Sequence, residues 1–121
     1  VDPLGVEWEM KSANIEKVSG FSTHHHLNFT ILKKYRSVPW SFATYKHIDL
    51  QEIYVMTPKE LEPMFQKWED SLTGKGDIPK VESINNPKIP IKFVQKAGHI
   101  IYPFKEGSVN PLEISKRVLK R

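Results

Sequence analysis

The chain has 121 residues, of which 39% are hydrophobic and 26% charged, a balance that predicts one soluble domain with a buried core. It contains no cysteine, which excludes disulfide scaffolds, thiol nucleophiles and zinc–thiolate sites, and no apolar run nears the roughly 20 residues that span a bilayer. The formal net charge of +4 favours a polyanionic partner, and the absence of a secretory segment at its start predicts a cytoplasmic protein.

The first predicted element is a strand over residues 5–12, where apolar and polar residues alternate strictly. Its buried face is expected to carry Val6, Trp8 and Met10. Its polar face carries Glu7, Glu9 and Lys11. Gly20 then breaks the chain, and a four-residue apolar spacing predicts a short helix that Pro39 ends. The apolar positions of this helix are Leu27, Ile31 and Tyr35.

Residues 40–56 are rich in aromatic and β-branched residues, which predicts two strands joined near His47–Gln51 as a hairpin. A helix follows, with Thr57 as its N-cap, a proline at its first position and Glu60 completing a capping box. Its apolar stripe is Leu61, Met64, Phe65, Trp68 and Leu72. Pro63 lies beyond the first turn of this predicted helix and is expected to bend its axis.

Residues 73–90 form a long polar connection, and residues 91–95 and 98–103 are predicted as a closing pair of strands. Beyond them, a second capping box predicts a basic amphipathic helix at residues 111–121. Strands and helices intermix, and successive strands are close enough for hairpins. The predicted fold is therefore α/β or α+β, with helices flanking a mixed central sheet.

Three histidines stand side by side in the run GFSTHHHLNFT, at His24, His25 and His26. Neighbouring side chains do not converge on one point in a strand and fit little better on a helix, so the run argues poorly for a metal site. From the run alone, metal ligands, catalytic bases and solvated histidines stay open as interpretations.

Glu9 and Lys11 form an E-x-K pair. Residues i and i+2 on a strand point the same way, so the carboxylate and the ammonium group can reach one reaction centre. A carboxylate can hold Mg²⁺, and the lysine can help to place a water for attack on a phosphate. The alternative is a solvated ion pair that contributes little.

Several strings, among them EMKSANIEKVSGFSTHHH, PKELEP and INNPKIPIKFV, closely resemble the PvuII-like family of type II restriction endonucleases. The resemblance runs from Val1 to about Trp68 and resumes from Ile84 to about Tyr102. It implies a homodimer of the PD-(D/E)xK nuclease fold that uses Mg²⁺ to cut the double-stranded palindrome CAGCTG to blunt ends. It also implies a restriction–modification system with a cognate DNA methyltransferase. The nuclease and recognition domain would span residues 1–102, followed by a basic extension at 103–121.

The resemblance also assigns residues. Glu9 and Lys11 match the second acid and the lysine of the nuclease motif, and Tyr35 matches a tyrosine close to the metal site. Two segments match loops that read DNA in the major groove. They contain Ser22 and His24–His26 in the first loop, and Asn85 and Asn86 in the second.

Base chemistry agrees with these two loops. Guanine presents two acceptors to the major groove and a neutral imidazole has an N–H to donate, while an asparagine amide can pair bidentately with adenine. Asn86 is therefore expected to read adenine, and His25 and His26 the central G·C pairs. Thr23 and His24 are expected to support the loop or contact the DNA backbone. A palindrome read by identical halves requires a two-fold dimer.

Basic side chains are candidates for phosphate contacts. They are Lys33, Lys34 and Arg36 on the helix after the histidines, and Lys88 in the asparagine loop. For the three helical residues, a solvated helix face is an equal alternative. The tail could grip flanking DNA, pack its apolar residues against the sheet, or stay disordered. Its basic residues are Lys116, Arg117, Lys120 and Arg121. Trp40 and Trp68 are expected in the core.

One departure from the family pattern concerns the metal site, because the first metal-binding aspartate would fall two positions before Val1. Asp2 could substitute only if the local path is rebuilt, and Glu7, on the same face as Glu9, is the other candidate. A DNA-binding module or fragment without cleavage activity is therefore an alternative. A nuclease for branched DNA and a histidine metal protein are further ones.

Overall fold

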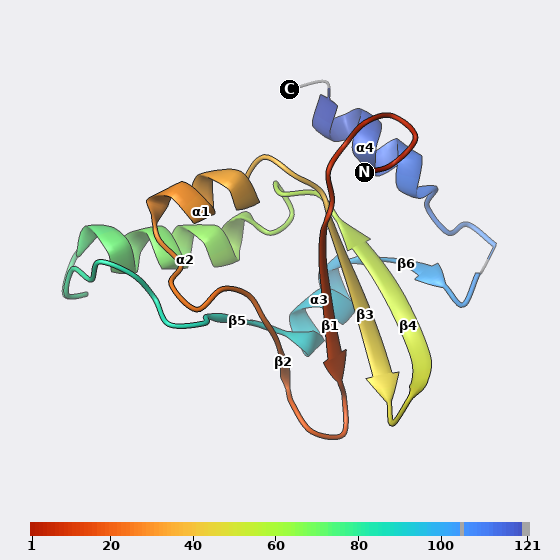
Figure 1. The fold of residues 1–121 in the computed structure, drawn as a ribbon, viewed down its shortest axis with the longest axis horizontal. Helices are drawn as coiled ribbons and strands as arrows, with labels where there is room; N and C mark the ends of the chain where they lie inside the picture. The colour runs from red at the N-terminus through yellow and green to blue at the C-terminus, as the bar shows by residue number, and fades with distance from the viewer. Residues whose placement is uncertain (105, 120–121) are drawn as a thin grey trace.

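The computed structural model describes residues 1–104 and 106–119, in which helices flank a four-stranded mixed sheet (Figure 1). The sheet has the order β1-β3-β4-β6 and comprises Glu9–Asn14 (β1), Trp40–Lys46 (β3), Asp49–Met56 (β4) and His99–Tyr102 (β6). β1 is parallel to β3, whereas β4 is antiparallel to both β3 and β6. The predicted α+β class and the predicted hairpin of residues 40–56 are confirmed.

The crossover from β1 to β3 carries the histidine run. It contains the short strand Gly20–Ser22 (β2) and the helix Phe29–Tyr35 (α1), and a parallel pair needs such a crossover. The Asn28 side chain caps α1 by accepting a hydrogen bond from the Ile31 N–H at 3.0 Å. β2 pairs antiparallel with Lys88–Pro90 (β5), and neither of these two short strands is predicted from the sequence.

The core lies on one face of the sheet. Trp40 and Phe42 of β3 are opposite Met56 and Tyr54 of β4, so these four side chains share that face. The helices α1, Glu62–Thr73 (α2) and Ile91–Ala97 (α3) contribute the other buried residues of the core cluster. Leu32, Phe65 and Val94 are among them. The two expected core tryptophans, Trp40 and Trp68, are 0% and 5% exposed.

The strand predicted over residues 5–12 begins only at Glu9. Of the side chains predicted to be buried, Val6 is buried, at 7% exposed, but the buried face predicted along β1 itself is wrong. Glu9 lies opposite Trp40 and Lys11 opposite Phe42, so the two charged residues point towards the covered face. Met10 points the other way and is 74% exposed. Alternation along a strand distinguishes its two faces, but the elements that cover one of them come from distant parts of the chain.

Residues 91–95 do not form the predicted strand, because they lie within α3. Ile91 and Val94 are three positions apart, which places both on the buried side of a helix. Gly98 ends α3, and a Cβ at this position would lie 2.6 Å from the Val94 carbonyl oxygen. Of the predicted closing pair, only the second strand exists, as β6.

The capping box at Thr57 is confirmed, but the helix begins later than predicted. The Thr57 N–H donates to Glu60 Oε1 at 2.9 Å, and the Glu60 N–H donates to Thr57 Oγ1 at 3.2 Å. A turn follows, and α2 begins at Glu62. Pro63 therefore lies in the first helical turn, where its missing N–H removes no helical hydrogen bond, and the predicted bend has no cause.

The predicted C-terminal helix is confirmed as Pro111–Leu119 (α4), and Lys120 and Arg121 lie outside the described residues. Ile114 and Ser115 are its buried residues, whereas Leu119 is 60% exposed. Figure 1 shows α4 beside the N-terminal segment. Within the described ranges, no helix is long and apolar enough to cross a membrane.

Candidate functional site

Glu9 and Lys11 form a partly buried ion pair on the covered face of β1. The Lys11 Nζ and Glu9 Oε1 atoms are 3.0 Å apart, and the two side chains are 17% and 20% exposed. Their i, i+2 spacing on one strand produces this contact. A pair this shielded from water attracts more strongly than a solvated pair, so its geometry is better defined.

Two further groups contact Lys11. Its Nζ donates to the Thr23 carbonyl oxygen at 3.2 Å and lies 5.8 Å from the centre of the Tyr35 ring. Burial, together with the nearby Glu9 carboxylate, raises the pKa of Tyr35 to about 12. The phenol is therefore protonated at neutral pH, and it can donate a hydrogen bond but cannot act as a base.

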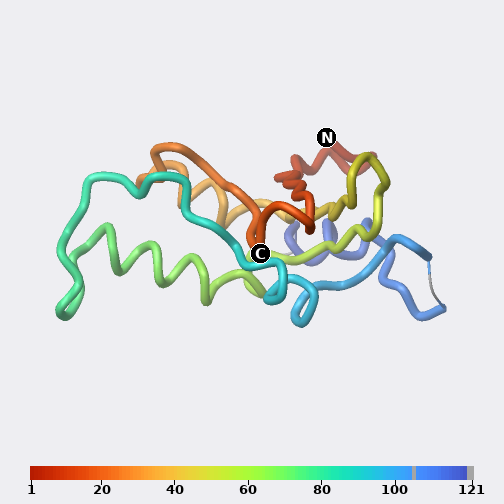
Figure 2. Tube along the Cα trace, turned by 90° about the horizontal axis from the view of Figure 1, so that it is seen from below, coloured from red at the N-terminus to blue at the C-terminus, as the bar shows by residue number. Residues whose placement is uncertain are grey.

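Two segments that are distant in the sequence form a ribbon beside this pair. Phe21 pairs with Ile89 between β2 and β5, both residues are fully buried, and Leu27 pairs with Ile84 at the other end. Between these anchors, the Asn86 N–H donates to the His24 carbonyl oxygen at 2.8 Å. Figure 2 shows the chain returning from α2 to run alongside the histidine segment. Residues 20–27 and 84–90 are called the recognition ribbon below.

Thr23 and Asn86 link the two halves of the recognition ribbon. The Thr23 N–H donates to Asn86 Oδ1 at 2.9 Å, and Thr23 Oγ1 donates to the Pro87 carbonyl oxygen at 2.6 Å. Asn86 has a φ of 48°, a left-handed conformation that asparagine tolerates better than most residues. Ser22 Oγ accepts a hydrogen bond from Lys88 Nζ at 2.7 Å. Asn85 is exposed.

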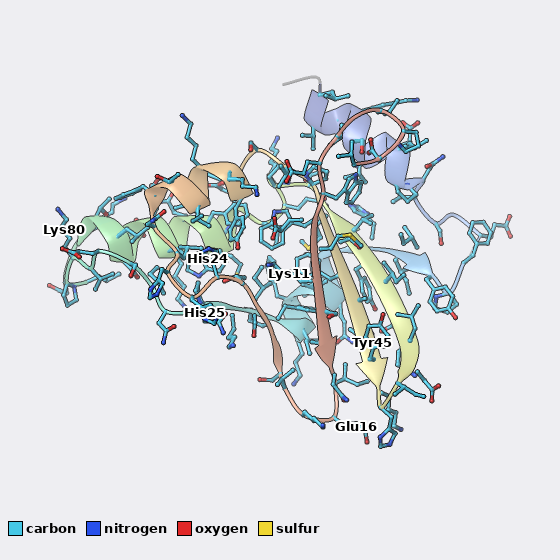
Figure 3. All side chains as sticks on the ribbon, in the orientation of Figure 1. Lys11, Glu16, His24, His25, Tyr45 and Lys80 are labelled. Atoms are coloured by element: carbon cyan, nitrogen blue, oxygen red, sulfur yellow. The ribbon has the colours of Figure 1, made fainter. Side chains whose placement is uncertain are left out.

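The three histidines have different environments. His24 Nδ1 accepts a hydrogen bond from the His26 N–H at 3.0 Å, so in this arrangement the proton of a neutral His24 ring is on Nε2. His25 and His26 are exposed and lie in a turn at the end of the ribbon. Figure 3 shows His24 and His25 on the segment between Lys11 and the α1–α2 pair. The histidines expected to read bases are thus the accessible ones.

Asp2 is not near Glu9. Its carboxylate accepts hydrogen bonds from the Leu4 and Val6 N–H groups at 2.9 and 3.0 Å, from Trp8 Nε1 at 2.8 Å and from the Ser115 hydroxyl. It lines a cavity of about 260 Å³ together with Met10, on the sheet face opposite Glu9. These contacts fill the acceptor sites of the carboxylate, and Asp2 is therefore left out of the metal site proposed below.

The hydrogen bond from Ser115, with those from Trp8 and the backbone, lowers the pKa of Asp2 from 3.8 to about 2. Because the folded-state pKa is the lower one, Asp2 stabilises the fold above pH 4, and this contribution is lost as the pH falls through about 2. We expect the Asp2→Asn variant to lose less stability than the wild type between pH 5 and pH 2.5. Thermal unfolding across this range tests it, with the exposed Asp77→Asn as the matched control. Parallel pH curves for Asp2→Asn and the wild type would contradict it.

The basic residues of α1 do not form one patch. Arg36 makes hydrogen bonds to Glu62 and Glu69, at 2.7 Å each, and so joins α1 to α2. Burial opposes its charge, but the two carboxylates raise the pKa of Arg36 overall. Lys34 Nζ lies 3.6 Å from the exposed Glu7 carboxylate, and Lys33 is exposed. Of the three, Lys33 is the best placed for a phosphate.

Metal binding has one clear candidate ligand. Among the described residues, no group of three or more His, Cys, Asp or Glu side chains is placed to hold a metal ion. Glu9 nevertheless suits Mg²⁺, which takes few carboxylate oxygens and keeps several waters. Its Oε1 atom contacts Lys11, and the pair is partly shielded from bulk solvent.

The contact between Lys11 and Thr23 has no signal in the sequence. The Thr23 group involved is a backbone carbonyl, which carries no residue-type signature, and β2 is only three residues long. The partner of β2 lies more than sixty positions away, as the pairing of Ser22 with Lys88 illustrates. A large apolar residue flanked by small or polar ones, at Phe21, and another flanked by Lys88 and Pro90, at Ile89, are too short a pattern to predict paired strands.

One known protein family matches most of the chain. A family model described as restriction endonuclease PvuII matches residues 1–102. The match covers every strand of the described structure, the helices α1 to α3, the Glu9–Lys11 pair and the recognition ribbon. The helix α4 lies outside it.

Proposed function

Because the chain belongs to the PvuII restriction endonuclease family, we propose that it is a type II site-specific nuclease that cuts double-stranded DNA at CAGCTG. The observation that carries this proposal is the contact of Lys11 with both Glu9 and Thr23. It joins a carboxylate–ammonium pair suited to phosphate chemistry directly to a ribbon suited to reading bases. Restriction–modification activity inside the cell, with a cognate DNA methyltransferase, is part of the proposal.

The recognition ribbon supports base reading because the major groove of B-DNA admits a two-stranded ribbon. His25 and His26 are exposed at its turn and can donate N–H groups to the acceptors of guanine. Asn86 can pair with adenine through both groups of its amide. Ser22, Asn85 and Lys88 lie on the same ribbon and complete the proposed DNA contacts.

In the proposed reaction, Glu9 holds Mg²⁺ and Lys11 positions the attacking water and the scissile phosphate. Bound Mg²⁺ supplies a water of lowered pKa and offsets the negative charge that develops on the phosphate. The Lys11 ammonium adds a second positive charge in a partly water-excluded site, where it acts more strongly. Tyr35 keeps its proton and packs under Lys11, which holds the ammonium near Glu9. Glu7, whose carboxylate is exposed and lies 3.6 Å from Lys34 Nζ, is the candidate second carboxylate.

The palindromic site requires a two-fold dimer, in which each copy reads one half-site with the same ribbon. We therefore expect two chains on one CAGCTG duplex. Sedimentation of the complex measures this ratio, and a saturated complex with one chain per duplex would contradict the dimer.

Sequence-specific binding is tested by fluorescence anisotropy with a CAGCTG duplex and a duplex of permuted sequence, without Mg²⁺. The proposal predicts at least ~100-fold tighter binding of the CAGCTG duplex at the same salt concentration. Equal affinities would contradict base reading by the ribbon.

Lys33 and Arg36 should respond differently to removal of their charge. For Lys33→Met, we expect the slope of log affinity against log salt to fall by about 2, one for each copy in the dimer, with unchanged stability. For Arg36→Met, we expect a loss of about 1 kcal/mol of unfolding free energy and an unchanged slope, because its partners are Glu62 and Glu69. Salt titrations of DNA binding and urea unfolding measure both. A reduced salt slope for Arg36→Met would contradict this and mean that Arg36 contacts a DNA phosphate.

A DNA-binding module without cleavage is the second candidate function. The observation in its favour is that the described residues provide no three-ligand metal group around Glu9. It predicts the same preference for CAGCTG but no strand breaks with Mg²⁺. Cleavage that depends on Glu9 separates the two candidates.

A further inference from the structure

Thr23 contacts both the catalytic lysine and the second recognition loop. Its carbonyl oxygen accepts from Lys11 Nζ at 3.2 Å, its N–H donates to Asn86 Oδ1 at 2.9 Å and its hydroxyl donates to the Pro87 carbonyl oxygen at 2.6 Å. We propose that Thr23 is a positioning residue that makes cleavage conditional on the base contact of Asn86. This inference rests on the proposed function, since it assumes that Asn86 reads adenine and that Lys11 serves the cleavage reaction.

The Thr23 N–H fixes the orientation of the Asn86 amide. A backbone N–H can only donate, so it selects Oδ1 of the amide and leaves Nδ2 facing away. The main chain of Asn86 is held as well, because its N–H donates to the His24 carbonyl oxygen. The amide therefore offers one Oδ1 lone pair and the Nδ2 hydrogens together. Adenine is the base with the matching donor and acceptor, at N6 and N7.

A wrong base creates a conflict at Thr23. Guanine presents two acceptors, O6 and N7, so one of them would face Asn86 Oδ1. A flip of the amide by about 180° only exchanges the acceptor that faces Oδ1, and it turns Nδ2 towards the Thr23 N–H, which places two donors against each other. The repulsion is relieved only when the amide swings away from the base. The hydrogen bond between Thr23 and Asn86 is then lost, and the Thr23 peptide is free to shift relative to Lys11.

The structure confines such a shift to the middle of the ribbon. Phe21 and Ile89 are fully buried at one end, and Leu27 and Ile84 exchange two backbone hydrogen bonds at the other. Between these anchors, Thr23 is only partly buried. Lys11 would lose its carbonyl partner and with it a defined position beside Glu9. A wrong base should therefore slow cleavage more than it weakens binding.

The test uses Thr23→Val, which keeps the shape of the side chain and both backbone hydrogen bonds but removes the hydroxyl bond to Pro87. Because the Thr23 peptide is then held less firmly, it can shift relative to Lys11 even when Asn86 meets adenine. Thr23→Ser restores a hydroxyl, and Thr30→Val makes the same change at an exposed position of α1. Single-turnover cleavage rates with Mg²⁺ and affinities without it are measured on a CAGCTG duplex and on one with each A·T pair replaced by G·C. Cleavage discrimination is the ratio of the cleavage rates on the two duplexes, and binding discrimination is the ratio of the two affinities. The quantity compared, called the excess, is the first ratio divided by the second.

We expect this excess to fall about five- to tenfold in Thr23→Val, while the affinity for the CAGCTG duplex changes less than about threefold. Thr23→Ser and Thr30→Val should keep the wild-type excess. If Thr23→Val loses affinity and cleavage in parallel with an unchanged excess, Thr23 only shapes the loop and the inference is wrong. If the wild-type chain cuts CAGCTG no faster than the substituted duplex, the proposed function itself fails, and the inference falls with it.

Discussion

Replacing Glu9 with glutamine is expected to lower the rate of Mg²⁺-dependent cleavage by about 10³-fold. The amide has nearly the same shape but no negative charge, so it binds Mg²⁺ poorly and no longer fixes the Lys11 ammonium. Binding of the CAGCTG duplex without Mg²⁺ should be unchanged or tighter, because a negative charge near the phosphate is removed. Single-turnover cleavage and anisotropy titration measure the two effects.

Glu16→Gln is the matched control for this prediction. Figure 3 shows Glu16 at the far end of the sheet from Lys11, and its Oε1 atom lies 3.3 Å from His47 Nε2. The same chemical change there should leave the cleavage rate within about twofold of the wild type. A Glu9→Gln variant that cuts at the wild-type rate would remove Glu9 from the metal site.

Replacing Trp40 with alanine is expected to cost about 3–5 kcal/mol of unfolding free energy. Trp40 is fully buried, and its Nε1 donates to the Tyr35 carbonyl oxygen at 3.1 Å. The centre of its ring lies 4.7 Å from the ring centre of Tyr35, 5.7 Å from that of Phe42 and 5.9 Å from that of Phe65. The total free energy of unfolding of a small domain is about 5–15 kcal/mol, so this variant is expected to be only marginally folded. Urea unfolding followed by circular dichroism measures the loss.

Two variants keep this prediction testable if Trp40→Ala does not fold. Trp40→Phe retains an aromatic ring but loses the Nε1 hydrogen bond, and about 1–2 kcal/mol of destabilisation is expected. Phe104 is 82% exposed, so Phe104→Ala should change stability by less than about 0.5 kcal/mol. A loss below about 1 kcal/mol in Trp40→Ala would mean that Trp40 is not at the centre of the core.

Short-range sequence patterns correctly predicted the elements that depend on neighbouring residues. The hairpin of residues 40–56, the Thr57 capping box and α4 all follow from residues within a few positions of each other. The spacing of Glu9 and Lys11 likewise predicts that the two side chains share a face. In each case, the physical cause is a backbone periodicity or a short-range hydrogen bond.

The predictions that failed concern features that depend on residues far away in the sequence. The covered face of β1 is set by β3 and by the core packed upon it, starting with the pairing of Glu9 with Trp40. The alternation of residues 5–12 says nothing of these partners. The hydrophobic run at Ile91–Ala97 fits a strand as well as a helix until Ile91 and Val94 meet the core.

The candidate site shows the same division. Chemistry and resemblance identify the residue types at Glu9, Lys11 and Asn86, but the hydrogen bonds through Thr23 connect segments more than sixty residues apart. The environment of Asp2 is set by Ser115, at a separation of 113 residues. No local pattern predicts either contact.

The most direct test of the account is cleavage of a supercoiled plasmid that carries one CAGCTG site, with Mg²⁺ and with the ends mapped by sequencing. We expect linear product with blunt ends between the central G and C, and no such product from the Glu9→Gln variant. Intact plasmid, or breaks unrelated to the CAGCTG site, would contradict the claim that the recognition ribbon directs the Glu9–Lys11 pair to its target.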